Sequence, residues 1–398
     1  MVCIQSIFEV LEDDNDTTSY ELKEIINLIS FVLVCGCNVQ GSKSLDCEEN
    51  GKCSCKPDFI GLKCDSCTEE YNEFPNHQGI PEVAALIVGG FDGFNELKTA
   101  EFIPQIGPSK KCSLPSLRTG IALQPSLIQT SDEILLCGEA TWDDKPYPLC
   151  PLFKRLCSVR LSKSYASKVF KCLELKDNQW QEHSQLKNKR GWSSAVTMPG
   201  GVYIFGGWGK SKTTWEWLPS GTNQWKSGNS GIPGGFSSGC AIQINDKDIL
   251  LIGGDGTRKR VLKFNTTAQE FTSLGDVLIQ GRYHHACTRM EDKIVIAGGY
   301  GSGNYLKSTE IINIHDLTAS HPAGNLVQKR GRHGLTVVHV DRKPTLLAVG
   351  GSNGHHSFLD SIEMWNAKTE TWTMTSMKLT EPKSSFGILA FPTRSVCS

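Results

Sequence analysis

The feature that most constrains this chain is an apolar run ending in two glycines, which recurs along its length. Five copies end in Gly89-Gly90, Gly206-Gly207, Gly253-Gly254, Gly298-Gly299 and Gly350-Gly351. A sixth, degenerate copy ends in Gly138-Glu139. Glycine readily adopts the positive φ that a tight turn after a strand requires, and the runs are rich in residues that favour strands. Such repetition indicates thin β-units that stack on one another to share a core.

The spacing of the copies gives the size of one unit. The last four doublets follow one another at intervals of 47, 45 and 52 residues. The interval from Gly138 to Gly207 is 69 residues because it carries an insertion around residues 143–166. Glycine accounts for 39 of the 398 residues, and helices tolerate glycine poorly. The composition therefore also favours a turn-rich, all-β protein.

A large aromatic ring follows several doublets at a nearly constant distance. Trp225, Phe271 and Trp372 lie 18, 17 and 21 residues after their doublets, and Trp180 takes this position after the insertion. We expect each ring to fill the outer end of its unit. Units one and five lack a clear ring, so their outer strands should be the least well packed.

These features resemble the kelch repeat over residues 81–394. The resemblance implies a six-bladed kelch-type β-propeller. Its first unit begins at the second strand of a blade, and residues 385–391 remain as an unpaired strand after the last unit. We expect residues 385–391 to join the first unit, because closing the ring removes the free sheet edges.

Cysteine is the second constraint. Of 16 cysteines, seven crowd into 33 residues: Cys35, Cys37, Cys47, Cys53, Cys55, Cys64 and Cys67. So short a stretch cannot bury enough apolar surface to offset its chain entropy, so disulfides or zinc must hold it together. Zinc sites usually show paired C-x2-4-C units at set distances, and this spacing does not. Disulfides are favoured, and they imply an oxidising compartment.

The order of these cysteines and their flanking glycines resemble a laminin-type EGF-like module, which with its linker covers residues 35–80. A small disulfide-rich module thus precedes the propeller, a combination also found in attractin-like cell-surface proteins. The resemblance implies the disulfides Cys35–Cys47, Cys37–Cys53 and Cys55–Cys64. Cys67 lacks its expected neighbour, and the next cysteine is Cys112. Either Cys67 is free or a Cys67–Cys112 bridge links the module to the next domain; we favour the bridge.

Residues 1–34 admit two interpretations. They begin acidic and end in an apolar run, residues 25–34, with the length of a secretory h-region but without basic residues ahead of it. We favour an atypical signal peptide cleaved close to Cys35 over a short helix that leads into the module. Asn15 and Asn265 lie in N-x-[ST] sequons and are glycosylation candidates. No apolar run approaches the ~18 residues that would span a bilayer.

The charge balance excludes partners that bind through a large basic field. Lys and Arg total 41 against 42 Asp and Glu, for a net charge of −1, so nucleic acid and anionic lipid are not expected. In the family, ligands meet the loops between second and third strands and between outer and inner strands. On this face we place Arg118, Arg190, Trp208, Arg258, Arg282, Tyr300, Arg332 and His355. Arginine with aromatic residues is typical of interface hot spots, and the cationic bias indicates an acidic protein segment or an anionic glycan. The alternative is an ordinary solvated loop surface.

The function we predict is that of a secreted, non-catalytic extracellular interaction protein that binds its ligand through this loop face. One alternative is a carbohydrate-active propeller enzyme resembling galactose oxidase or the sialic acid mutarotases. Another is an intracellular kelch adaptor, disfavoured because no α-helical oligomerisation region precedes the repeats. No cofactor is predicted. No metal site is predicted either, because the adjacent pairs His284-His285 and His355-His356 each point in opposite directions in an extended segment.

Overall fold

The computed structural model describes residues 42–47, 53–55, 59–60, 66–67, 83–103, 114–121, 124–130, 133–138, 171–177, 179–340 and 343–392. The chain divides into two compact units, Met1–Pro81 and Glu82–Ser398. Within the described residues, no helix has the length and apolar character needed to cross a membrane.

The first unit holds two small antiparallel sheets. They pair β1 (Ser42–Cys47) with β2 (Cys53–Cys55) and β3 (Phe59–Ile60) with β4 (Ser66–Cys67). Cys53 is buried and disulfide-bonded, which fits a module held together covalently. The predicted bridges Cys35–Cys47, Cys37–Cys53, Cys55–Cys64 and Cys67–Cys112 each involve residues that lie outside the part of the chain whose side chains are described.

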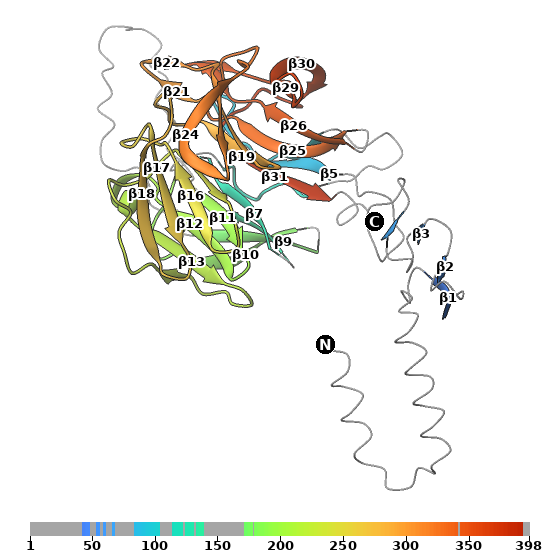
Figure 1. Cartoon of the computed structure of the whole chain (residues 1–398). Helices are drawn as coiled ribbons and strands as arrows, with labels where there is room; N and C mark the ends of the chain where they lie inside the picture. Colours follow the sequence, from blue (N-terminus) through green and yellow to red (C-terminus); the bar gives the residue numbers. More distant parts are fainter. Residues whose placement is uncertain are drawn as a thin grey trace, which may run out of the picture. The chain divides into compact units, whose positions relative to one another are not determined.

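The second unit is a six-bladed β-propeller, in which the strands of each blade follow one another from the innermost outwards (Figure 1). Blade one has β31 (Gly387–Pro392), β5 (Val83–Val88) and β6 (Ala100–Ile103). Blade two has β7 (Ser126–Gln129), β8 (Ile134–Cys137), β9 (Lys171–Lys176) and β10 (Gln179–Gln185). Blade three has β11 (Ser194–Met198), β12 (Gly201–Phe205), β13 (Trp215–Pro219) and β14 (Lys226–Ser227), with the 3-10 helix η1 (Gly209–Thr213) between β12 and β13.

The remaining blades follow the same plan. Blade four has β15 (Cys240–Gln243), β16 (Asp248–Ile252), β17 (Arg260–Asn265) and β18 (Glu270–Asp276). Blade five has β19 (Ala286–Met290), β20 (Lys293–Ala297), β23 (Thr309–Asn313) and β24 (Asp316–Ala323). Blade six has β25 (Gly334–Val340), β26 (Lys343–Val349), β29 (Ser361–Asn366) and β30 (Thr371–Lys378). Two hairpins extend their loops: β21 (Tyr300–Gly301) with β22 (Asn304–Tyr305), and β27 (Ser352–Gly354) with β28 (Ser357–Phe358).

The last strand of the chain closes the ring. β31 pairs antiparallel with β5, with Gly387 opposite Val88 and Leu389 opposite Leu86, and the two lie side by side in Figure 1. The innermost strands contact one another in the order β31, β7, β11, β15, β19, β25 and again β31. This pairing confirms that the end of the chain supplies the inner strand of blade one.

The predicted aromatic rings connect neighbouring blades. Trp225 of blade three is buried and donates its indole N–H to Ser184 of blade two, with Nε1 2.9 Å from Oγ. Trp372 of blade six likewise donates to Thr309 of blade five, at 3.0 Å. Trp180 is buried in the core cluster that blades one and two share. Each tryptophan therefore packs between its own blade and the preceding one, where burying its ring contributes most.

Two disulfides that the sequence analysis did not assign lie within the propeller. Cys137 and Cys172 are directly opposite on the neighbouring strands β8 and β9. Cys240 and Cys287 join β15 to β19, the innermost strands of blades four and five, across a Cα–Cα distance of 5.9 Å. The second disulfide therefore links one blade to the next.

Candidate ligand-binding face

One residue in every blade has the same unusual backbone. Each lies two positions before an innermost strand and has a φ between 53° and 57°. These six residues, the ring residues, are Gln124, Trp192, Ser238, His284, Arg332 and Ser385. A positive φ in a residue with a Cβ costs about 1 kcal/mol or more. Its repetition in all six blades therefore needs a compensating interaction.

That interaction is a series of backbone hydrogen bonds from blade to blade. In five of the six blades, the amide N–H of the ring residue donates to the carbonyl of the ring residue in the preceding blade. The N···O distances are 2.9 Å for Ser238 to Trp192, 2.7 Å for His284 to Ser238, 2.8 Å for Arg332 to His284, 2.9 Å for Ser385 to Arg332 and 3.0 Å for Gln124 to Ser385. Because the innermost strands surround the propeller axis, the ring residues encircle that axis at one edge. The Gly doublets end the second strands at the same edge, since each second strand runs antiparallel to its inner strand.

In four of the blades, the residue two positions before the ring residue is the cation of a buried charge pair. The pairs are Arg190–Glu216, Arg282–Glu310, Arg330–Glu363 and Lys383–Glu101. Arg330 shows the geometry: its guanidinium donates to Glu363 Oε1 at 3.0 Å and to the carbonyls of Gly350 and Ser361 at 2.8 Å each. The cation thus fixes the carbonyl of the first doublet glycine and the start of the third strand.

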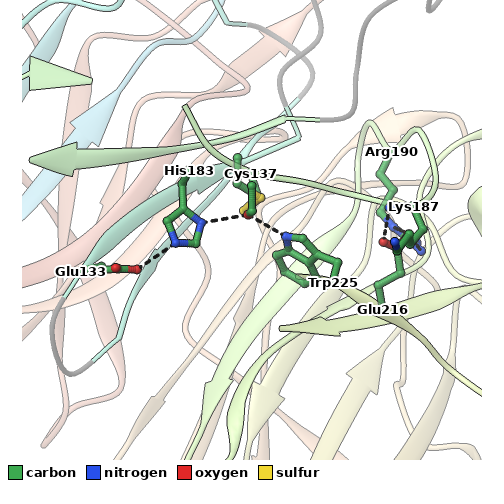
Figure 2. Close-up of a disulfide and its surroundings, with 9 residues drawn as sticks. Glu133, Cys137, His183, Lys187, Arg190, Glu216 and Trp225 are labelled. Atoms are coloured by element: carbon green, nitrogen blue, oxygen red, sulfur yellow. Dashed lines mark hydrogen bonds and ion pairs between the residues drawn. A yellow bond between two sulfur atoms is a disulfide. The ribbon is translucent and has the colours of Figure 1, made fainter. Parts of the chain in front are cut away.

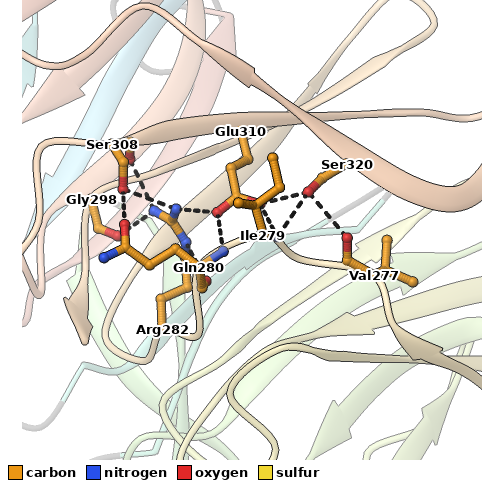
Figure 3. Close-up of polar contacts among 8 residues, drawn as sticks. All are labelled: Val277, Ile279, Gln280, Arg282, Gly298, Ser308, Glu310 and Ser320. Atoms are coloured by element: carbon orange, nitrogen blue, oxygen red, sulfur yellow. Dashed lines mark hydrogen bonds and ion pairs between the residues drawn. The ribbon is translucent and has the colours of Figure 1, made fainter. Parts of the chain in front are cut away.

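The Glu of each pair is also tied to the backbone. Figure 3 shows the blade-five pair, in which the carboxylate of Glu310 accepts hydrogen bonds from the N–H groups of Ile279 and Gln280 at 2.8 and 3.0 Å. Burial opposes ionisation of Glu310, but the charge of Arg282 and these hydrogen bonds outweigh it, so the pKa of Glu310 lies below its ordinary value. The pair is therefore ionic and fully hydrogen-bonded, which a buried pair needs to be stable.

These contacts correct part of the predicted ligand face. Arg190 and Arg282 have side chains with 0% exposure, so neither guanidinium can meet a ligand. The sequence analysis placed them on the face because they lie in loops between outer and inner strands; arginine is almost never fully buried unless it is paired. Their partners, Glu216 and Glu310, follow 26 and 28 residues later on the third strand, a separation that the motif did not reveal.

Blades two and four carry apolar residues where the others carry the charge pair. The strand registers place Leu173 and Leu262 where Glu216 lies in blade three. The cation is replaced by Ile121 and by Phe236, both buried. A cation before the ring residue always occurs with a Glu on the third strand, and an apolar residue there occurs with a Leu on the third strand. The two positions therefore act as one structural unit.

The residue after the ring residue fills the space between blades. His285 and His333 are buried there, each near the Gly doublets of two adjacent blades, and Phe386 takes the equivalent position. Burial is the main cause that lowers the pKa of His285 to about 3 and that of His333 well below its ordinary value. Both rings are therefore neutral packing groups at neutral pH.

At the same edge as the ring residues, aromatic side chains form a continuous row across blades three to five. Its members are Trp208, Trp192, His284, Tyr283, Tyr300 and Tyr305, and consecutive ring centroids are 6.2, 5.8, 5.0, 5.4 and 5.3 Å apart. Trp208 is 57% exposed. This aromatic row therefore presents a large, rigid, partly apolar surface beside the propeller axis.

Two cations border the aromatic row. Arg258 is exposed and lies 5.1 Å from the ring centroid of Tyr283, and it shares Asp255 with Lys212. Arg332 is a half-buried ring residue, and the described part of the chain contains no ion pair to it. Burial, followed by the charge of Arg332, holds the pKa of His284 well below its ordinary value. The face thus carries a net positive charge next to a neutral imidazole.

The other predicted site residues are placed as follows. Arg118 and His355 are exposed, and Tyr300 is half-buried within the row. Asn265 is half-buried and donates from Nδ2 to Asp248 Oδ1 at 2.8 Å, while Asn15 lies outside the described residues. The sequence analysis placed Arg332 on the ligand face but not Gln124, Ser238, His284 or Ser385. Their common signal, a position two residues before each inner strand, becomes visible only when the six repeats are aligned on that strand.

Comparison with known proteins identifies both parts of the chain. Residues 192–393 match the family described as the KLHDC2/KLHL20/DRC7 Kelch-repeats domain, and residues 35–81 match the laminin EGF domain. The chain therefore belongs to the kelch-repeat family and carries an N-terminal laminin EGF module. Kelch propellers generally bind proteins, and laminin EGF modules are typical of extracellular proteins.

Individual relatives agree with this division. The module is 52% identical over 40 residues to laminin subunit gamma-1 of Danio rerio, which is 10% of this chain and 2% of that protein. It is 42% identical over 45 residues to laminin-like protein lam-2 of Caenorhabditis elegans, which is 11% of this chain and 3% of that protein. These matches thus span only a small part of either relative. The solved structure described as "Structure of YjhT" superposes with a TM-score of 0.52 at 13% identity, covering 68% of this chain and 88% of that chain, which supports the propeller fold.

Proposed function

We propose that this protein is a secreted, non-catalytic interaction protein whose propeller binds an anionic partner at the face formed by the ring residues and the aromatic row. The observation that carries the proposal is the position of Arg332 beside His284 and Tyr283 of the row, without a carboxylate partner among the described residues. A half-buried guanidinium beside aromatic rings is a typical binding anchor. An acidic protein segment or an anionic glycan supplies the complementary charge.

The composition of the ring supports binding rather than catalysis. The six ring residues include no Asp, Glu or Cys. Acid–base hydrolysis or transfer on a sugar commonly uses a pair of carboxylates, and copper-radical chemistry needs a thiolate and tyrosines. The extracellular location rests on the laminin EGF module and on the two disulfides within the propeller.

The test is binding of the whole chain to an immobilised panel of acidic peptides and sulfated or sialylated glycans. Replacing Arg258 and Arg332 together by Ala should weaken binding to the member that the wild type selects by about 100-fold, which is about 2.7 kcal/mol. Arg289→Ala is the matched control, because Arg289 is an exposed arginine at the far end of an inner strand.

Two results would count against the proposal. Equal affinity of the Arg258/Arg332 double variant and the wild type would move the site to another face. Chemical turnover of a bound glycan by the wild type would favour the carbohydrate-active alternative. Binding restricted to the peptides or to the glycans decides which partner class is recognised.

A further inference from the structure

A second cluster of polar side chains lies in blade two, at the edge opposite the ring residues. Glu133 precedes β8, Glu174 is on β9 and His183 is on β10. One ligand atom from each of the three lies within 4.8 Å of the others. Neither the ligand face nor the charge pairs involve these residues.

A β-bulge turns His183 toward the two carboxylates. On β10, Glu182 is opposite Leu173 and Ser184 is opposite Cys172, so His183 is the extra residue. A bulge redirects the side chain of the inserted residue, and bulges are frequent next to functional sites. The His183 side chain is only 9% exposed, so its imidazole is held in one orientation before any ligand arrives.

The orientation of His183 is fixed by a hydrogen-bonded relay. Its Nδ1 is 2.8 Å from Ser184 Oγ, and that hydroxyl accepts a 2.9 Å hydrogen bond from Trp225 Nε1. Its Nε2 faces Glu133 Oε2 at 3.3 Å (Figure 2). Metal-binding histidines typically have one nitrogen held by such a partner, which leaves the other free to coordinate.

The electrostatics also favour a cation at this point. Two carboxylates within 4.8 Å of each other repel unless a positive charge lies between them. Two ligands bound at about 2.1 Å to a tetrahedral ion lie roughly 3.4 Å apart, and the distance from Glu133 to His183 already has nearly this value. Closing the cluster on an ion therefore needs only a small movement of the Glu174 side chain.

We propose that Glu133, Glu174 and His183 form a binding site for a divalent transition-metal ion such as Zn²⁺. One imidazole nitrogen with two carboxylate oxygens suits this class, whereas Ca²⁺ prefers six to eight oxygen ligands. Coordination by Nε2 leaves the proton on Nδ1, and Ser184 Oγ can accept from both Nδ1 and Trp225 because a hydroxyl has two lone pairs.

The site is open on one side. Glu133 and His183 line a hollow of about 990 Å³ between blades two and three. Three protein ligands leave the fourth tetrahedral position for water or for a donor atom from a molecule in this hollow. The arrangement is that of an accessible site rather than a closed structural one.

The test is titration of the whole disulfide-bonded chain with Zn²⁺ after removal of any affinity tag, followed by calorimetry and by thermal unfolding. We expect one ion per chain and a rise in the melting temperature. Substitutions Glu174→Gln and His183→Asn should each weaken Zn²⁺ binding at least about 100-fold, and Ser184→Ala by about 10-fold. With Co²⁺, the wild type should show visible absorption bands of tetrahedral coordination that His183→Asn lacks.

Two controls separate this site from general surface binding. His315 forms a similar exposed pair with Asp292 at 3.4 Å, so Asp292→Asn should leave Zn²⁺ affinity unchanged. His355→Ala with His356→Ala removes the exposed histidine pair and should also have no effect. No binding by the wild type, or binding that survives in His183→Asn but disappears in the His355/His356 variant, would overturn the proposal.

Discussion

At the residue scale, the space between the Gly doublet and the third strand is filled in one of two ways, by a charge pair or by apolar residues. Four blades place a cation and Glu between the doublet and the third strand, and blades two and four place apolar residues there. Burying two ions costs several kcal/mol each, which their attraction offsets only when both are present. The two positions are therefore energetically coupled, and the coupling can be measured.

Arg330 and Glu363 provide that measurement. Arg330→Leu should destabilise the propeller by about 3–5 kcal/mol, because it leaves the Glu363 carboxylate buried without its cation. Adding Glu363→Leu, which gives an apolar pair like those of blades two and four, should make the double variant more stable than Arg330→Leu alone. Urea unfolding of the wild type, both single variants and the double variant gives the coupling energy. Strictly additive losses would show that the two residues do not act as a unit.

The buried histidines predict how stability depends on pH. The folded state keeps His285 neutral down to about pH 3 and His333 neutral well below its ordinary pKa, whereas the unfolded chain protonates them near pH 6.5. Below about pH 6.5 the unfolded state binds more protons, so stability falls as the pH falls, by up to about 1.4 kcal/mol per pH unit for each histidine.

The variant His333→Phe tests whether the buried histidines cause this loss of stability, because Phe386 occupies the equivalent position in blade one. The variant should lose less stability than the wild type between pH 6.5 and 4, as measured by thermal unfolding at several pH values. Replacing the exposed His321 by Phe is the matched control and should leave the slope unchanged. A slope identical in wild type and His333→Phe would assign the acid sensitivity to other groups.

At the element scale, the blades, the charge pairs and the His183 cluster show which features a linear sequence pattern can predict and which it cannot. The doublets and the aromatic positions predicted the blades, because strand periodicity and turn glycine are local properties. Burial of Arg190 and Arg282 was not predictable in this way, since it depends on a Glu that follows more than 25 residues later. The cluster around His183 was also missed, because a bulge that redirects one side chain leaves no pattern in the sequence.

The Cys240–Cys287 disulfide should contribute to the cohesion of two blades. It closes a loop with a sequence separation of 47, for which loop-closure entropy corresponds to about 4 kcal/mol. Cys240→Ala with Cys287→Ala should therefore lower the free energy of unfolding by about 2–4 kcal/mol in urea. Intact mass after alkylation should show the same number of free thiols in wild type and variant. Two extra alkylated cysteines in the wild type would show that the bridge does not form.

At the scale of the whole molecule, stability depends on the ring being closed by its two ends. β31 at the end of the chain pairs with β5 near its start, so blade one exists only when both ends are in place. Residues in β31 also complete the clusters on both sides of blade one, where Phe391 packs with blade two and Ile388 with blade six. Loss of this strand would leave β5 with a free edge and two half-open interfaces.

Deletion of residues 386–398 should abolish cooperative unfolding, because the core of blade one then faces water and each neighbour loses part of its interface. Thermal unfolding and hydrogen exchange measure this: the transition should broaden, and protection should be lost first in β5 and β6. Deletion of residues 393–398, which leaves β31 intact, is the matched control and should keep a sharp transition. A synthetic peptide with the sequence of residues 385–392, added to the shorter chain, should partly restore protection of β5. If the 386–398 deletion instead unfolds as sharply and at the same temperature as the wild type, pairing of the chain ends does not hold the propeller together.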